Sequence, residues 1–171
     1  DLQELSAGKP LQPKFMINLG FVLAQTGSIA EAEALYRRAL AIRWLAPGAL
    51  NLANQLFSQR DTRPAVRQET LGLLESIEDY YGSRSAQWGM RAKLHAELGQ
   101  EDLRLSVLRR GIAVARDIGK NSLRGDLLLD LAVQPRSVAR DAEIRTVLSE
   151  FIVDLRPYLE ATPEDTSRHV L

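Results

Sequence analysis

Apolar residues recur at three- and four-residue steps along most of the chain, which is the spacing of one face of an α-helix. No segment shows the alternation of apolar and polar residues that indicates a half-buried strand. The pattern therefore predicts an all-α protein. The helices are expected at about 15–26, 29–44, 49–59, 65–81, 85–98, 101–118, 121–133 and 138–160.

Glycine and proline separate these segments. Gly27, Gly99 and Gly119 each follow a predicted helix directly, which is a typical stop signal. Pro47-Gly48 and the stretch "RDTRP" mark further turns. Connections of roughly two to six residues place sequential helices antiparallel, as neighbours. The chain is thus expected to repeat a helix, a short turn and a helix.

Small and large residues follow a fixed order through the first predicted pair. The order is a large residue, Leu-Gly, a large residue, Gly, Ala, an aromatic residue and Ala. It resembles the tetratricopeptide repeat (TPR), a helix–turn–helix unit of about 34 residues. Small residues are expected where two helices approach too closely for a large side chain. The matching residues are Met16, Leu19, Gly20, Leu23, Gly27, Ala32, Tyr36 and Ala39.

Two further units match this pattern less well. The second has Glu69 in place of the aromatic residue, and the third has Arg104 in place of an alanine and His95 at a large position. The wider spacing between these units predicts an extended second helix near 65–81. The matching residues are Leu52, Ala53, Leu56, Ala65 and Gly72 in the second unit, and Trp88, Ala92, Gly99, Leu108 and Gly111 in the third.

The resemblance implies a solenoid of about four helix pairs wound into a right-handed superhelix. An irregular helical bundle is the alternative fold. Four regions are expected: a leading loop or the end of a preceding helix at 1–12, three TPR-like pairs at 13–118, a divergent capping pair at 119–160, and a polar tail at 161–171. In the last pair, Ile144, Val147, Leu148, Phe151, Ile152, Leu155 and Leu159 form one apolar stripe.

Composition argues against catalysis and against several classes of ligand. The 22 basic and 22 acidic residues cancel, so no overall charge favours nucleic acid or an anionic membrane. No apolar run reaches the length of a membrane-spanning helix. The chain has no cysteine and two histidines, and "HAEL" at 95–98 lacks the cysteines of a zinc deaminase. We therefore expect no enzyme, no cofactor and no metal.

Repeat arrays bind partners, and the resemblance implies a concave groove lined by the first helix of each unit. A partner helix or extended segment with an apolar anchor would suit this groove. The alternative is that each of these residues is an ordinary half-exposed helix residue. The carboxylate clamp of chaperone-binding TPR domains is matched only at Asn54 and Lys93. The expected groove residues are Ile17, Phe21, Gln25, Asn54, Phe57, Ser58, Lys93 and Glu97.

The function expected from these features is a protein-interaction scaffold or adaptor within a larger bacterial assembly. The alternative is a TPR component of an exopolysaccharide synthesis or secretion machine, acting as a scaffold or contacting polysaccharide through exposed aromatic residues. The candidates for such contact are Trp44, Tyr80, Tyr81 and Trp88. A start at Asp1 favours a fragment of a longer, envelope-associated protein, in the cytoplasm or the periplasm.

Overall fold

The computed structural model describes residues 11–81, 86–132 and 138–160, and the secondary structure in these ranges is entirely α-helical. The all-α prediction is therefore confirmed. Residues 1–10 of the leading segment expected at 1–12, and the tail at 161–171, lie outside the described residues. The chain divides into two compact units, Asp1–Gln100 and Glu101–Leu171, and each is described here by itself.

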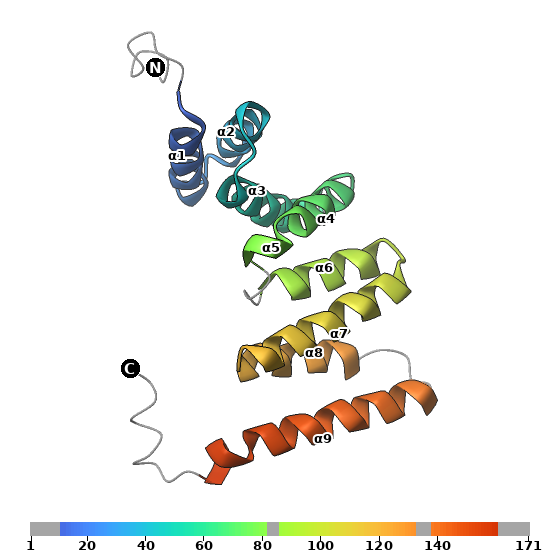
Figure 1. The fold of residues 1–171 in the computed structure, drawn as a ribbon. Helices are drawn as coiled ribbons and strands as arrows, with labels where there is room; N and C mark the ends of the chain where they lie inside the picture. The colour runs from blue at the N-terminus through green and yellow to red at the C-terminus, as the bar shows by residue number, and fades with distance from the viewer. Residues whose placement is uncertain (1–10, 82–85, 133–137, 161–171) are drawn as a thin grey trace. The chain divides into compact units, whose positions relative to one another are not determined.

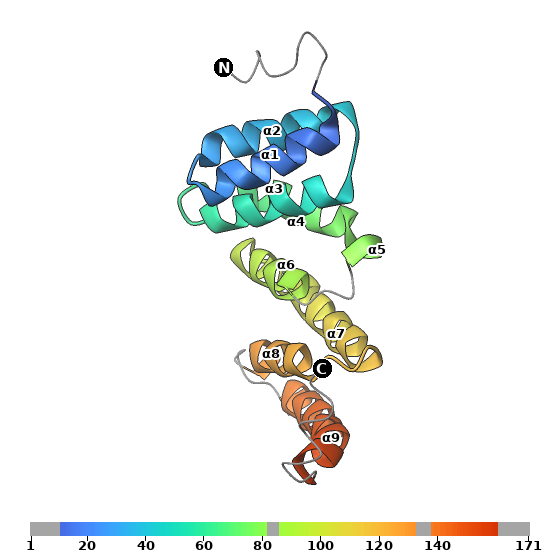
Figure 2. The same ribbon diagram turned by 90° about the vertical axis from the view of Figure 1, so that its left-hand side faces the viewer.

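The first unit is built from two antiparallel helix pairs followed by two further helices (Figures 1 and 2). The first helix of each pair packs along the second, and the two pairs also pack against one another through α2 and α3. The elements are α1 (Pro13–Gln25), α2 (Ile29–Ile42), α3 (Ala46–Gln59), α4 (Val66–Ser76), α5 (Glu78–Tyr81) and α6 (Ala86–Glu97).

The second unit contains α7 (Glu101–Asp117), α8 (Asn121–Ala132) and α9 (Val138–Glu160), with α8 packed against both other helices. The apolar stripe predicted on α9 is only partly covered. Val147 and Phe151 are half-buried, whereas Leu148 and Ile152 are exposed. The predicted pairing of α6 with α7 spans the division between the two units and remains a prediction.

Three glycines end helices as predicted. Gly27, Gly99 and Gly119 have φ angles of +87°, +71° and +66°, which a side chain would strain. At Gly27, the N–H of Ser28 donates to the carbonyl of Leu23 at 2.9 Å, and the N–H of Gly27 donates to Ala24 at 3.3 Å. The same pair of bonds follows at Gly99 and at Gly119, so all three are Schellman motifs.

Two predicted boundaries are wrong. Pro47-Gly48 does not separate helices but lies in the first turn of α3, where proline loses no hydrogen bond because the first N–H groups of a helix have no partner within it. The helix predicted at 65–81 is interrupted at Ile77, which divides it into α4 and α5. The side chain of Ile77 is buried at this break.

The small residues of the first pair lie where helices meet. A Cβ on Gly20 would stand 2.8 Å from Cε1 of Tyr36, so α1 touches the aromatic ring of α2 at this point. Ala32 and Ala39 are fully buried beside it. Around them the first core cluster joins α1 to α4: Met16, Ile17, Ala32, Tyr36, Ala39, Leu52, Leu56 and Val66.

The register predicted for the second helix of the second pair is wrong by one residue. Ala65 and Gly72, the expected small contacts, are exposed, and a Cβ on Gly72 would meet nothing within 4 Å. The buried residues are Val66 and Thr70, which follow Ala32 and Tyr36 by 34 residues. In α3, by contrast, buried Ala53 follows Gly20 by 33 residues. The stretch from Ala53 to Val66 is therefore one residue longer than its counterpart from Gly20 to Ala32.

Candidate functional site

An open hollow of about 260 Å³ lies among α1, α2 and α3. No charged side chain lines it, and amide and hydroxyl groups supply its polar surface. It is therefore a neutral site that offers both hydrogen-bond donors and acceptors beside apolar carbon. Its lining residues are Phe21, Ala24, Gln25, Ile29, Tyr36, Asn51, Asn54, Gln55 and Ser58.

Four of the expected groove residues meet in this hollow. Phe21 and Gln25 come from α1, and Asn54 and Ser58 come from α3. Phe21 is 50% exposed, so a large apolar side chain of this lining is open to a ligand. The spacing of these residues on two packed helices thus creates one continuous surface.

Ile17 does not belong to that surface. It is 5% exposed and belongs to the first core cluster, because Gly48 brings the backbone of α3 close to it. A Cβ on Gly48 would stand 2.8 Å from Cδ1 of Ile17. Phe57 is also partly covered, since the guanidinium of Arg60 lies 4.1 Å above its ring centroid.

The two expected residues of α6 do not line this hollow either. The Glu97 carboxylate is held by Arg60 Nε at 3.0 Å and by Arg67 Nε at 2.9 Å. These contacts attach α6 to the second helix pair, which gives Glu97 a structural role. Lys93 is exposed on the same helix.

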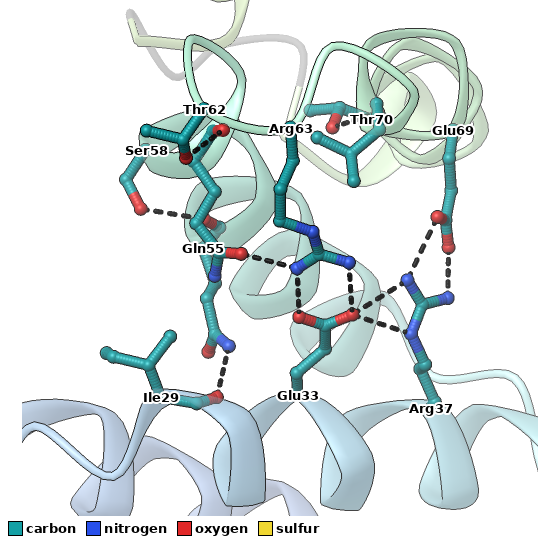
Figure 3. A network of polar contacts seen from close by, with 11 residues as sticks. Ile29, Glu33, Arg37, Gln55, Ser58, Thr62, Arg63, Glu69 and Thr70 are labelled. Atoms are coloured by element: carbon teal, nitrogen blue, oxygen red, sulfur yellow. Dashed lines mark hydrogen bonds and ion pairs between the residues drawn. The ribbon is translucent and has the colours of Figure 1, made fainter.

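Gln55 and Asn51 are site residues that the sequence reasoning missed. Gln55 is almost completely buried, and its Nε2 donates to the carbonyl of Ile29 at 2.6 Å (Figure 3). Its Oε1 is buried with no hydrogen-bond partner among the described residues. The polar pattern "NxxNQxxSQ" in α3 could have indicated these residues, because it places amide side chains on one helix face beside the buried face of the same helix.

Ion pairs behind the hollow attach the first helix pair to the second. Figure 3 shows Arg63 of the α3–α4 connection meeting Glu33 of α2, at 2.7 Å, while Arg37 meets both Glu33 and Glu69 of α4. The hydrogen bond from Arg63 lowers the pKa of Glu33, and Arg37 contributes in the same direction.

An aromatic pair lies exposed elsewhere on the first unit. The rings of Trp44 and Tyr80 have centroids 5.4 Å apart with 49° between their planes. Trp44 is 43% exposed and Tyr80 is 64% exposed, so each ring presents area to solvent. Trp88 is 1% exposed and is therefore closed to any ligand.

Within the described ranges, no group of three or more His, Asp or Glu side chains is placed to hold a metal ion. His95 is buried, with its Nδ1 at 2.8 Å from Oε1 of Gln100. No helix in the described parts of the chain is long and apolar enough to span a bilayer. A scan of protein families found no family model that matches the chain, and a search of curated proteins found no matching relative.

Proposed function

We propose that this chain is a non-catalytic interaction module whose TPR-like helix pairs bind a segment of a partner protein. In this proposal the pairs continue as a solenoid with a right-handed superhelical path, and the hollow of α1 and α3 lies on its concave side. The regular antiparallel pairing of α1 with α2 and of α3 with α4 supports this arrangement. The module would serve as a scaffold or adaptor in a larger bacterial assembly.

The observation that carries the proposal is the half-exposed Phe21 in a neutral, amide-lined hollow. Exposed aromatic residues in concave sites are the usual anchors of protein interfaces. Asn51, Asn54 and Gln25 can each donate to a carbonyl and accept from an N–H, which suits an extended backbone. The absence of charge from the lining favours an uncharged partner segment with one apolar side chain.

Substituting Phe21 tests this proposal against a closely matched control. Phe15 is on the same helix and is 52% exposed, but it does not line the hollow. A photoreactive phenylalanine analogue at position 21 is expected to cross-link one defined protein in cells of the source organism. Phe21→Ala should then weaken binding of that purified protein by roughly 10- to 100-fold, because an aromatic anchor is lost. Calorimetry measures the affinity.

The same analogue at position 15 should give no such cross-link, and Phe15→Ala should leave the affinity unchanged. Asn54→Ala provides a second variant, since it removes an amide from the hollow without touching the core. Equal cross-linking from positions 15 and 21, or an affinity indifferent to both Phe21→Ala and Asn54→Ala, would reject the groove as the binding site.

The aromatic pair favours a second candidate, direct contact with polysaccharide in an exopolysaccharide machine. Sugars have an apolar face that could lie on the exposed surface of an indole or phenol ring, and Trp44 and Tyr80 provide two such rings side by side. The pair and the hollow share no residue, so a scaffold could carry both sites.

Tryptophan fluorescence tests the sugar candidate. Cellohexaose and maltohexaose, two neutral oligosaccharides, are expected to shift the emission of Trp44 if either stacks on its ring. Trp88 supplies a constant background because it is buried. Trp44→Ala should abolish the shift. A weak contact with an aromatic ring is expected to have a dissociation constant of about millimolar. If millimolar sugar leaves the emission spectrum unchanged, this candidate is rejected.

A further inference from the structure

A hollow of about 270 Å³ lies within the second unit, among α7, α8 and α9. Its apolar lining comes from Ile112, Ala113, Leu131 and Val147. Its charged lining consists of three arginines and three carboxylates, so its net charge is zero. These charged residues are Arg109, Arg116, Arg124, Asp117, Glu143 and Glu150.

Arg124 differs from the other two arginines because it is buried. It stands on the inward face of α8 together with Leu127, Leu128 and Leu131, and only 1% of it is exposed. Its Nη1 donates to the carboxylate of Asp154, and its guanidinium lies 5.0 Å from the ring centroid of Phe151. Burying a cation in this way is costly unless its hydrogen-bonding groups are satisfied.

Two nitrogens of Arg124 are not satisfied. Nε and Nη2 are buried, with less than 1 Å² of surface each, and neither has a hydrogen-bond partner in the described part of the chain. These two nitrogens share one edge of the planar guanidinium and direct two N–H bonds in parallel. That edge matches the two oxygens of a carboxylate or a phosphate in a bidentate pair.

The charges around the hollow distinguish between these two oxyanions. Glu143 accepts from Arg109 Nη2 at 2.7 Å, and Glu150 accepts from Arg116 Nη1 at 3.0 Å. Arg124 is itself paired with Asp154 through Nη1, but among the arginines of this lining it is the one with two buried nitrogens that have no hydrogen-bond partner. A carboxylate brings one negative charge toward Asp154 and the three carboxylates of the lining, whereas a phosphate would bring about two, so the carboxylate meets the smaller repulsion.

We propose that this hollow binds a carboxylate carried on a small aliphatic group. The carboxylate pairs with Nε and Nη2 of Arg124, and the aliphatic part packs on Ile112, Leu131 and Val147. Because Nε and Nη2 of Arg124 are covered, binding requires a neighbouring side chain to move aside. The carboxylate belongs either to a small free acid or to the C-terminus of a protein that ends in an aliphatic residue.

The experiment follows the Nε–H signal of Arg124 in ¹H–¹⁵N spectra of the full chain. Sodium butyrate is expected to move this signal downfield, because its carboxylate would accept a hydrogen bond from an N–H group that otherwise has no partner. A probe this small binds no more tightly than about millimolar, so the titration extends to on the order of 100 mM. Butyramide and inorganic phosphate at matched ionic strength should leave the signal in place.

Two variants separate the site from general charge effects. Arg124→Lys keeps the positive charge but removes the bidentate edge, and it should weaken butyrate binding by about tenfold. Ala113→Leu keeps Arg124 but fills the hollow from an exposed position, so it tests the site even if Arg124→Lys fails to fold. Ala142→Leu, on an exposed part of α9 outside the lining, is the matched control.

Peptides ending in Ala-Val identify the source of the carboxylate. If the peptide with a free C-terminal carboxylate binds more tightly than butyrate, and the amidated peptide does not bind, the natural ligand is a protein C-terminus. Butyrate binding without peptide binding indicates a small acid. The proposal is overturned if no carboxylate moves the Arg124 signal, if butyramide moves it equally, or if folded Ala113→Leu binds butyrate as the parent does.

Discussion

The Gly20→Leu variant is expected to lose roughly 1–3 kcal/mol of unfolding free energy, because overpacking a filled core forces side chains from their rotamers. Even a Cβ at this position would stand 2.8 Å from Tyr36, whose ring is buried and has little room to turn. Denaturant unfolding followed by circular dichroism measures the loss. Because Tyr36 and Gln55 both line the hollow, a displaced ring should also disturb the proposed binding site.

Gly72→Leu is the control for this prediction. Gly72 is also inside a helix, but a Cβ there would meet nothing within 4 Å. Leucine is a better helix former than glycine, so this variant is expected to gain up to about 0.5–1 kcal/mol. Equal losses at positions 20 and 72 would show that glycine is required for a reason other than the contact with Tyr36.

Trp88→Ala is expected to have the largest effect of any single truncation, about 3–5 kcal/mol of unfolding free energy. Trp88 is among the largest fully buried side chains in the described residues. The guanidinium of Arg91 lies 5.1 Å from its ring centroid, and Arg91 also pairs with Glu78 at 2.6 Å. Truncation would therefore leave a cavity and loosen a buried ion pair at the same time.

Trp44→Ala provides the contrast, because Trp44 is the other tryptophan of the chain and is 43% exposed. Its loss should cost less than about 1 kcal/mol. Fluorescence gives an independent check, since acrylamide should quench the emission of Trp44 strongly and that of Trp88 weakly. A stability loss at Trp44 equal to that at Trp88 would contradict the packing of both residues.

Local signals in the sequence predicted most of the secondary structure. Gly27, Gly99 and Gly119 could be recognised as helix ends because few other residues adopt their backbone conformation at low cost. The contact of Gly20 with the second helix of its pair was also predictable, since a fixed spacing places it opposite Tyr36. Both kinds of signal depend on residues close together in the sequence.

Features that depend on distant residues were not predictable in the same way. The register of α4 was misjudged because Ala65 and Gly72 are small, and size alone does not distinguish a tight contact from an exposed position. Ile17 was wrongly assigned to the groove. Gly48 of α3 covers its side chain, and the sequence does not show how closely α3 approaches α1. Four of the groove residues that the TPR resemblance implied nevertheless lie together in the hollow.

Arg124 was overlooked although its sequence context contained a signal. It occupies one position of a buried stripe that is otherwise leucine, and a charged residue at such a position needs a partner. The sequence could not identify Asp154 as that partner, because the two residues lie on different helices. Nor could it show that two nitrogens of Arg124 have none.

The ion pairs of Glu33 and Arg37 have a consequence for how such a chain can evolve. The contacts of Glu33 with Arg63 and of Arg37 with Glu69 join two different helix pairs, so Arg63 and Glu69 form a complement to the first pair in particular. If a duplicated copy of the first pair took the place of the second pair, Glu33 and Arg37 of the original would face a surface that lacks Arg63 and Glu69. Shuffling could preserve the shape of each hairpin, but the charges at its edges specify which hairpin is its neighbour.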